Sequence, residues 1–137
     1  MSYGIAAALQ AAVFQKLSGD TALTALVGGA IYDALPAGIL PQIYVTLGPE
    51  DARERADGTG QGAWHQFIVS VATDGAGFHA AKEVAAAISD ALVDADLSLS
   101  RGRLVALHFN RARARREDQG EMRRIDLTFR ARVEETT

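Results

Sequence analysis

The segment RARARRE, Arg111 to Glu117, places four arginines within seven residues of a chain whose net charge is −3. Guanidinium groups bind carboxylates and phosphates through paired hydrogen bonds, so this segment is a candidate binding surface. The residues alone leave three roles open. The arginines could bind nucleic acid, contact an acidic surface on another copy of the chain, or keep an exposed strand soluble.

Each role makes a different demand on the rest of the sequence. Charge commonly keeps a strand edge solvated, and nearby carboxylates could neutralise the arginines: Glu117, Asp118, Glu121 and Asp126. Nucleic-acid binding usually adds stacking aromatics, but no aromatic residue lies between Phe109 and Phe129. Contact with a second copy suits the charge distribution best. Residues 101–137 carry ten basic and six acidic residues, whereas residues 1–100 carry four basic and eleven acidic residues.

An acidic, glycine-rich segment, residues 48–62, is the second unusual feature. It contains four glycines, four acidic residues and no large apolar residue, which predicts a long loop. Such loops within compact domains are usually functional or disordered. Its carboxylates lack the 12-residue pattern of a calcium-binding loop, so we interpret them as solvated charge and as a candidate contact surface.

Motifs for catalysis or cofactor binding do not occur. His65, His79 and His108 lack metal-ligand spacing, the chain has no cysteine, and neither a nucleophile elbow nor a phosphate-binding loop is present. The GTGQG stretch lacks the flanking strand and helix of a dinucleotide-binding motif. The sequence therefore predicts no enzyme, no metal site and no cofactor.

Periodic patterns predict the elements that position these segments. Apolar residues at three- and four-residue steps predict helices over residues 3–17 and 78–93. A shorter helix is expected between Asp20, at the N-cap position, and Gly28. Alternating apolar residues predict strands over residues 42–48, 63–73, 104–109 and 122–133.

The last two strands are expected to form a protruding hairpin with a three-residue loop at residues 118–120. Pairing around this loop places Phe109 opposite Phe129 and Leu107 opposite Ala131, so the two apolar faces coincide. In the same register Arg115 faces Arg123, with Arg116 and Arg124 nearby. The parity also predicts that Arg111, Arg113 and Arg115 continue the apolar face of their strand beyond the edge of the core.

These elements predict an α+β fold: a mainly antiparallel four- to five-stranded sheet with helices on one face, in a single domain over residues 1–137. The 48% hydrophobic and 23% charged residues are ordinary for a globular protein. Because no signal peptide and no apolar run long enough for a membrane are found, and because cysteine is absent, we expect a soluble intracellular product without a membrane partner.

Taken in order, the segments resemble the tail terminator, or tail-completion, proteins of long-tailed phages and gene transfer agents. The resemblance covers almost the whole chain and follows the order of segments rather than one motif. The segments are LSGDTALTALVGGAIYDALP, PQIYVTLG, HQFIVSVAT, FHAAKEVAAAISDAL, LSLSRGRLVALHFNRARARRED and MRRIDLTFRARVEE.

The resemblance implies a structural role. Similar proteins form a hexameric ring on the last ring of the tail tube, stop further tube polymerisation and present a surface to the head-proximal connector, or stopper. The implied partners are further copies of the chain, the tail tube protein and the connector, with DNA passing through the ring without specific binding. The implied location is the tail of a virion or gene transfer agent particle, assembled in the bacterial cytoplasm.

The assignment of ring contacts to residues is our own hypothesis, from charge and expected exposure. The alternative is a small nucleic-acid-binding module that uses the basic C-terminal hairpin. The candidate contact residues are Arg111, Arg113, Arg115, Arg116, Arg123 and Arg124 in the hairpin, and Glu50, Asp51, Arg53, Glu54, Arg55 and Asp57 in the acidic segment.

Overall fold

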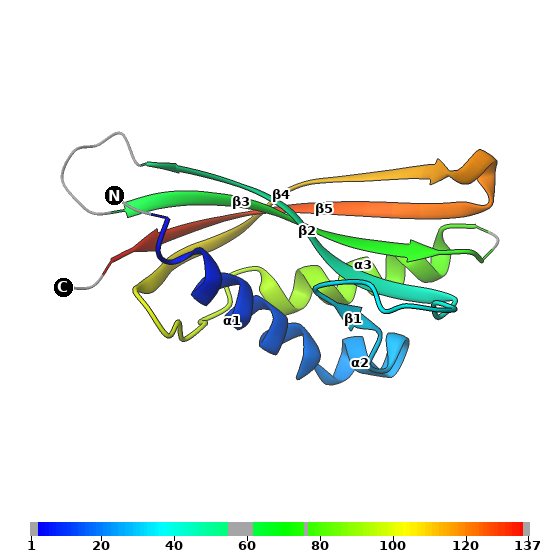
Figure 1. Ribbon diagram of the computed structural model, residues 1–137, viewed down its shortest axis with the longest axis horizontal. Helices are drawn as coiled ribbons and strands as arrows, with labels where there is room; N and C mark the ends of the chain where they lie inside the picture. Colours follow the sequence, from blue (N-terminus) through cyan, green and yellow to red (C-terminus); the bar gives the residue numbers. More distant parts are fainter. Residues whose placement is uncertain (1–2, 55–61, 76, 136–137) are drawn as a thin grey trace.

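The computed structural model describes residues 3–54, 62–75 and 77–135. Its strands form one five-stranded mixed sheet in the order β1-β2-β3-β5-β4, and its helices lie along one side of that sheet (Figure 1). The fold is α+β, as expected. The elements are α1 (Ala6–Ser18), α2 (Thr21–Val27), β1 (Ile31–Tyr32), β2 (Ile43–Glu54), β3 (Gly62–Thr73), α3 (His79–Leu92), β4 (Arg103–Glu117), the 3-10 turn η1 (Asp118–Gly120) and β5 (Met122–Glu134).

The three helices begin and end close to where the sequence pattern places them. α1 and α3 present rows of alanine and branched aliphatic residues to the sheet, which lets both helices approach it closely. The Asp20 carboxylate caps α2 by accepting a hydrogen bond from the Leu23 amide at 2.9 Å. The helix ends at Gly28, whose φ of 62° lies in the left-handed region that glycine adopts without strain.

Strand directions follow from the ladder pairings. β1 is parallel to β2 and pairs with it at Val45 and Thr46. The β2–β3, β3–β5 and β5–β4 pairings are antiparallel. β3 and β5 pair from Gly62 opposite Glu134 to Thr73 opposite Arg123, so the centre of the sheet is continuous along its whole length.

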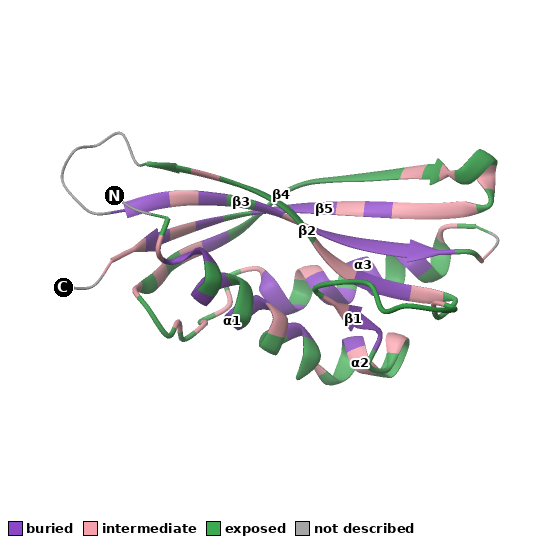
Figure 2. Cartoon of the chain, viewed as in Figure 1, coloured by how far each residue is buried: buried purple, intermediate pink, exposed green. Residues whose placement is uncertain are grey.

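The main core lies between the helices and the facing side of the sheet (Figure 2). Val69 and Val71 of β3 and Leu127 and Phe129 of β5 point into it, and all four are almost completely buried. We call this side of the sheet the helix side and the opposite side the helix-free face. At one end of the helix-free face, a small second cluster of Ala30, Tyr44 and Ala72 is buried by partly exposed neighbours.

The expected hairpin is present, and its apolar pairs are confirmed. Phe109 lies opposite Phe129, and Leu107 lies opposite Ala131. The loop residues Asp118, Gln119 and Gly120 all have positive φ, at 53°, 57° and 91°. β5 stays paired with β3 as far as Arg123, so only the residues of the turn extend beyond that ladder.

Beyond Phe109 the predicted register is wrong, because β4 contains an extra residue. Phe109 pairs with Phe129, and Arg111 pairs with Thr128, so Asn110 has no opposite residue. Because side chains alternate between faces, one extra residue reverses the facing of all that follow. The predicted pair Arg115–Arg123 is replaced by Arg115 opposite Arg124, and by Arg116 opposite Arg123.

The reversal moves the arginines off the apolar side. Arg111, Arg113 and Arg115 lie on the helix-free face, whereas Ala112 and Ala114 take the helix-side positions opposite Leu127 and Ile125. The expectation that the arginines continue the apolar face is therefore wrong. Ala112 and Ala114 occupy the positions that continue the apolar face, and both residues are exposed.

The predicted loop over residues 48–62 is also corrected. β2 continues to Glu54, because an irregularity at Gly48 and Pro49 lets pairing with β3 resume at Glu50 opposite Phe67. β3 then begins at Gly62. Several acidic residues of this segment thus belong to a strand, and residues 55–61, with Arg55 and Asp57, lie outside the described residues.

Replacing Phe129 by alanine tests the centre of this core. Phe129 is completely buried and contacts both Phe67, with ring centroids 5.8 Å apart, and Phe109, at 6.0 Å. We expect Phe129→Ala to lower the free energy of unfolding by about 3–5 kcal/mol. Phe109→Ala is the matched control, because its ring is 45% exposed and its loss should cost clearly less. Urea denaturation measures both, and equal losses would contradict the assignment of Phe129 to the centre.

Candidate assembly surfaces

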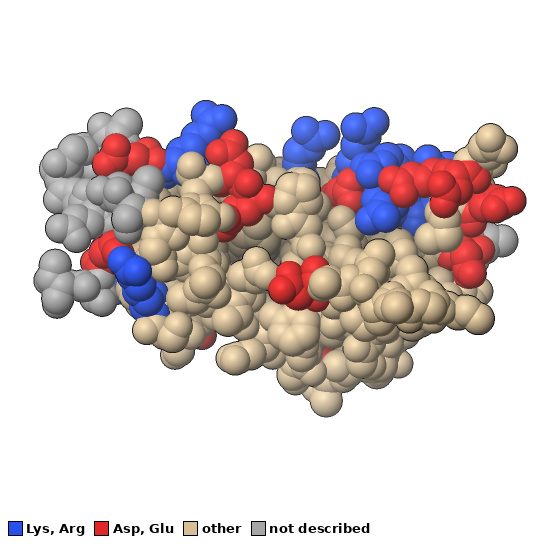
Figure 3. All heavy atoms as spheres, viewed as in Figure 1, with Lys and Arg blue, Asp and Glu red and all other residues tan. Residues whose placement is uncertain are grey.

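The helix-free face concentrates the basic residues of the chain (Figure 3). Register and alternation place eight described arginines there but only four acidic residues, a surplus of four positive charges on a chain that is negative overall. The helix side is mostly neutral in the same view. The arginines are Arg53, Arg103, Arg111, Arg113, Arg115, Arg124, Arg130 and Arg132, and the acids are Asp51, Glu117, Asp126 and Glu134.

Near the hairpin turn, carboxylates neutralise two of the arginines. Glu117 accepts hydrogen bonds from Arg115, at 2.8 and 3.1 Å, and from Arg124 at 3.0 Å. Arg115 also bonds to Asp126, which in turn accepts a 2.6 Å hydrogen bond from the Ser70 hydroxyl. Glu117 therefore bridges the two like charges of the Arg115–Arg124 pair, and Asp126 adds a second carboxylate beside Arg115. This is the local neutralisation that the sequence allows.

These contacts shift the ionisation of both partners. Hydrogen bonds from Arg124 and then Arg115 lower the pKa of Glu117 below its ordinary value. Hydrogen bonds to Glu117 and then Asp126 raise the pKa of Arg115. Both directions favour the charged pair, so the cluster is formed at neutral pH.

Other arginines of the same strand remain unneutralised. Within the described residues, Arg111, Arg113 and Arg116 form no ion pair. Arg111 and Arg113 are exposed along β4, and no strand pairs with the outer edge of β4 in the described part of the chain. Unpaired guanidinium groups beside an open strand edge form a surface suited to an acidic partner.

Arg123 has a different role from the other candidates. It donates to the carbonyl oxygen of Gly75 at 3.2 Å and lies over the Phe78 ring, 5.7 Å from its centroid. These contacts fix the hairpin end of β5 to the segment that leads into α3. Within the subunit, Arg123 therefore has a structural role.

Trp64 organises the other end of the helix-free face. Arg130 stacks over its indole ring at 4.0 Å, and Arg132 lies 5.9 Å from the ring centroid. A shallow groove of about 260 Å³ runs beside them and is also lined by Asp51 and Arg53. The alternation that predicts the strand over residues 63–73 does not reveal this arrangement, because it gives no information on which arginines of β5 lie beside Trp64.

Glu50 is directed away from this face. Its carboxylate lies on the helix side and contacts His65 Nδ1 at 2.9 Å and the Tyr3 hydroxyl. His65 is completely buried, and its ring stacks against Tyr3 with centroids 6.2 Å apart. The hydrogen bond to Glu50 raises the pKa of Tyr3. Glu50 thus ties the start of the chain to β2 and β3, and neither Tyr3 nor His65 was predicted to interact with it.

The remaining acidic candidates lie along the open part of β2. Asp51 faces the helix-free side and pairs with Arg53 at 3.3 Å, with both side chains largely exposed. Such an exposed pair contributes little stability and exchanges partners readily. Glu54 is exposed at the end of the strand. Arg55 and Asp57 lie outside the described residues.

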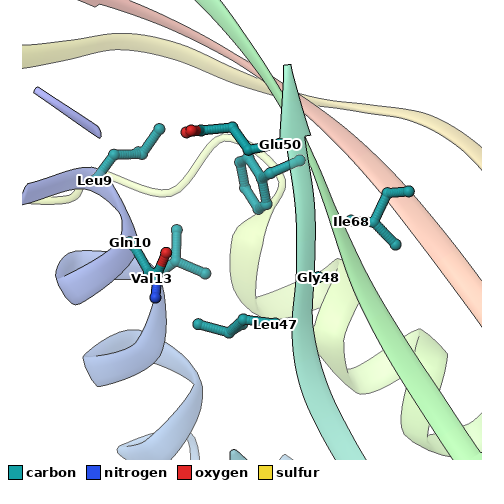
Figure 4. A pocket seen from close by; sticks show the side chains of 8 residues that line it. Leu9, Gln10, Val13, Leu47, Gly48, Glu50 and Ile68 are labelled. Atoms are coloured by element: carbon teal, nitrogen blue, oxygen red, sulfur yellow. The ribbon is translucent and has the colours of Figure 1, made fainter. Parts of the chain in front are cut away.

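A small pocket between α1 and β2 does not resemble an active site (Figure 4). Its volume is about 30 Å³, and apolar side chains such as Leu9, Val13 and Phe67 line most of it. That space holds about one water molecule rather than a substrate. Among the residues that the structure describes, no group of three or more metal-binding side chains occurs.

Comparison with known proteins identifies the class. The family described as Tail completion protein gp17 matches residues 11–134, and the chain belongs to this family of structural, non-enzymatic tail proteins. A solved chain from the "Virion of native gene transfer agent (GTA) particle" is 63% identical, with a TM-score of 0.92 over 97% of this chain and 99% of that chain. No curated protein matches.

None of the described helices is long and apolar enough to cross a membrane.

Glu117 supplies a pH-dependent test of the hairpin. Because its folded pKa is lowered, its contribution is complete above the unfolded value, about 4.3, and is lost as the pH falls through the folded value. We therefore expect the Glu117 carboxyl to titrate at a lower pH than an ordinary glutamate in a carbon-13 NMR titration. Arg124→Gln should move that midpoint upward, since Arg124 makes the largest contribution. An unchanged midpoint in Arg124→Gln would show that the pairing is absent in solution.

Proposed function

We propose that copies of this chain form a ring at the end of a phage-like or gene transfer agent tail tube. In this role the ring stops tube polymerisation and joins the tail to the head-proximal connector. Membership of the tail completion family and the similarity to a chain of a gene transfer agent virion support this role. The proposed location is the particle tail, with DNA passing through the ring.

The observation that carries the ring is the separation of charge between the two edges of one sheet. β4, at one edge, presents the unneutralised Arg111 and Arg113. β2, toward the other edge, ends in the acidic stretch Glu50–Glu54. A surface on one side that complements a different surface on the other generates a head-to-tail contact, which closes into a ring when the rotation allows. A self-complementary patch would instead produce a dimer.

The contacts within the subunit narrow the candidate residues. Arg115 and Arg124 already share Glu117, Arg123 anchors the hairpin, and Glu50 bonds to His65. The proposed intersubunit charges are therefore Arg111, Arg113 and Arg116 on one side and Asp51 on the other, because the only ion pair of Asp51 among the described residues is the exposed and weak one with Arg53. The tail tube protein and the connector are expected to contact the two rims of the ring.

Nucleic-acid binding is the second candidate, and the positive surplus of the helix-free face favours it. That face carries four more arginines than acidic residues, and Trp64 lies within it. However, Arg130 covers the Trp64 ring, so the indole is not free to stack with a base. Chromatography in a salt series, with and without duplex DNA, separates the two functions. A ring retains a multimeric mass without DNA, whereas a binding module changes size only when DNA is added.

Charge reversal of the free arginines tests the ring. We expect Arg111→Glu with Arg113→Glu to abolish the multimer in native mass spectrometry and to give particles with abnormal tails, because the acidic edge of the neighbour would then be repelled. Lys16→Glu with Lys82→Glu is the matched control, since it changes the net charge equally at exposed positions on helices. Normal multimers and normal tail lengths from the arginine variant would contradict the proposed contact.

A further inference from the structure

We propose that neighbouring copies in the ring are joined by β-sheet pairing, with β4 of one copy antiparallel to β2 of the next. The two strands are offset along their length by about four to six residues, so that Ala52 of one copy lies against Ala112 or Ala114 of its neighbour. Asp51 then lies opposite Arg113 in the first register, or opposite Arg115, which Glu117 and Asp126 already bind, in the second. This inference rests on the proposed ring and specifies how it closes.

Both strands have an open edge at the required place. No strand of the described residues pairs with the outer edge of β4, and Ala112 and Ala114 beside that edge are exposed. On β2, β1 pairs only with Val45 and Thr46, so no described strand pairs with the outer edge of β2 from Glu50 to Arg53. Unpaired strand edges present rows of N–H and C=O groups that bind another strand.

The direction of pairing follows from symmetry. The successive antiparallel pairings β2–β3, β3–β5 and β5–β4 make β2 and β4 run in opposite directions. Rotation about a ring axis roughly along the strands preserves strand direction. β4 of one copy therefore meets β2 of the next as an antiparallel pair.

The size of the offset follows from the tilt of strands in closed sheets. Four strands of each copy contribute a width of about 19 Å at about 4.8 Å per strand. Strands in closed barrels tilt by about 35–45° from the axis. Because the strands are tilted, a line drawn around the ring perpendicular to its axis meets successive strands at successively displaced residues. Across the four strands of one copy this displacement along the strand direction is about 13–19 Å, or about four to six residues at 3.3 Å each.

The direction of the offset follows from chirality. β3 and β4 are parallel and are connected through α3, and such crossovers are right-handed. Strand twist gives closed sheets one hand of tilt. With the helices outside the ring, these two rules bring the C-terminal half of β4 to the far end of β2, at Glu50–Glu54. With the helices inside, the offset would be reversed and would carry the arginines beyond Ile43.

The position of β1 on the edge of β2 agrees with this offset. Without an offset, the ladder places Arg113 level with Thr46 and Ala114 level with Val45, where β1 already occupies the edge. The offset moves β4 past β1 to the open edge. It also brings the arginines of β4 to the end of β2 that carries Asp51 and Glu54, although Arg53 then lies opposite Arg111 or Arg113, so strand geometry rather than net charge selects the register.

The arrangement also sets the width of the opening. On the proposed count of six copies, about 24 strands close into a barrel with a backbone diameter of about 50 Å. Barrels of 16–18 strands already leave an aqueous channel, so this ring would be open. The helix-free face, with its surplus of arginines, would line that opening.

Cysteine cross-linking tests the register directly, because the chain has no native cysteine. The variants are Ala52→Cys with Ala112→Cys and Ala52→Cys with Ala114→Cys, which keep every charge. Within one copy these positions are separated by at least three strand spacings, about 14 Å, and also lie in different rows, so they are too far apart for a disulfide. We expect oxidation of purified particles, or of the free multimer, to give a ladder of covalent oligomers on non-reducing gels for at least one pair.

The control is Leu47→Cys with Ala112→Cys, a pair that keeps every charge, lies in one row of the sheet and reports pairing without an offset. Cross-links from this control alone would overturn the proposed register. Multimers of normal mass with no ladder from any pair would overturn strand pairing while leaving the ring intact. Absence of a multimer in both free protein and particles would instead contradict the proposed function.

Discussion

The surface chemistry of this protein depends on Asn110, the second of two extra residues in β4. Asn110 has no partner on β5, and beyond it every side chain of β4 faces the side opposite to the one that simple alternation predicts. Without this bulge, Arg111, Arg113 and Arg115 would point to the helix side, and Ala112 and Ala114 would face away from it. Because the alanines take the helix-side positions, β4 extends beyond the helices without burying a charge and without exposing a large apolar side chain.

The bulge also explains which parts of the structure could be predicted from sequence. The helices follow from periodicity, the α2 cap from the aspartate at position 20, and the pairs Phe109–Phe129 and Leu107–Ala131 from the position of the turn, all of which are local properties. The register beyond Phe109 depends on whether one residue is accommodated as a bulge, and alternation cannot reveal that. The acidic segment has the composition of a loop, and its strand is not predicted for a related reason. Gly48 and Pro49 interrupt the pairing of β2 with β3, which resumes at Glu50.

The distribution of charge along the sequence predicted the charged face of the sheet better than it predicted individual ion pairs. The sequence separated a basic C-terminal part from an acidic remainder, and the fold places that basic part largely on one face of the sheet. It did not reveal that Glu117 binds Arg115 and Arg124, or that Glu50 turns inward to His65, because these pairings require knowledge of the facing of each strand. The side chains that satisfy one another within the subunit leave a smaller set available for assembly.

That smaller set bears on how β4, an edge strand of 15 residues, avoids indiscriminate pairing with other strand edges. Two β4 strands that paired with each other would oppose arginine rows, and like charges directly opposed destabilise a strand pair. A symmetric dimer through β4 is therefore disfavoured, whereas pairing with the acidic end of β2 is favoured by opposite charge. In the proposed ring, the same arginines that discourage indiscriminate edge pairing would direct β4 toward a different edge of an identical copy, the kind of contact that closes into a ring.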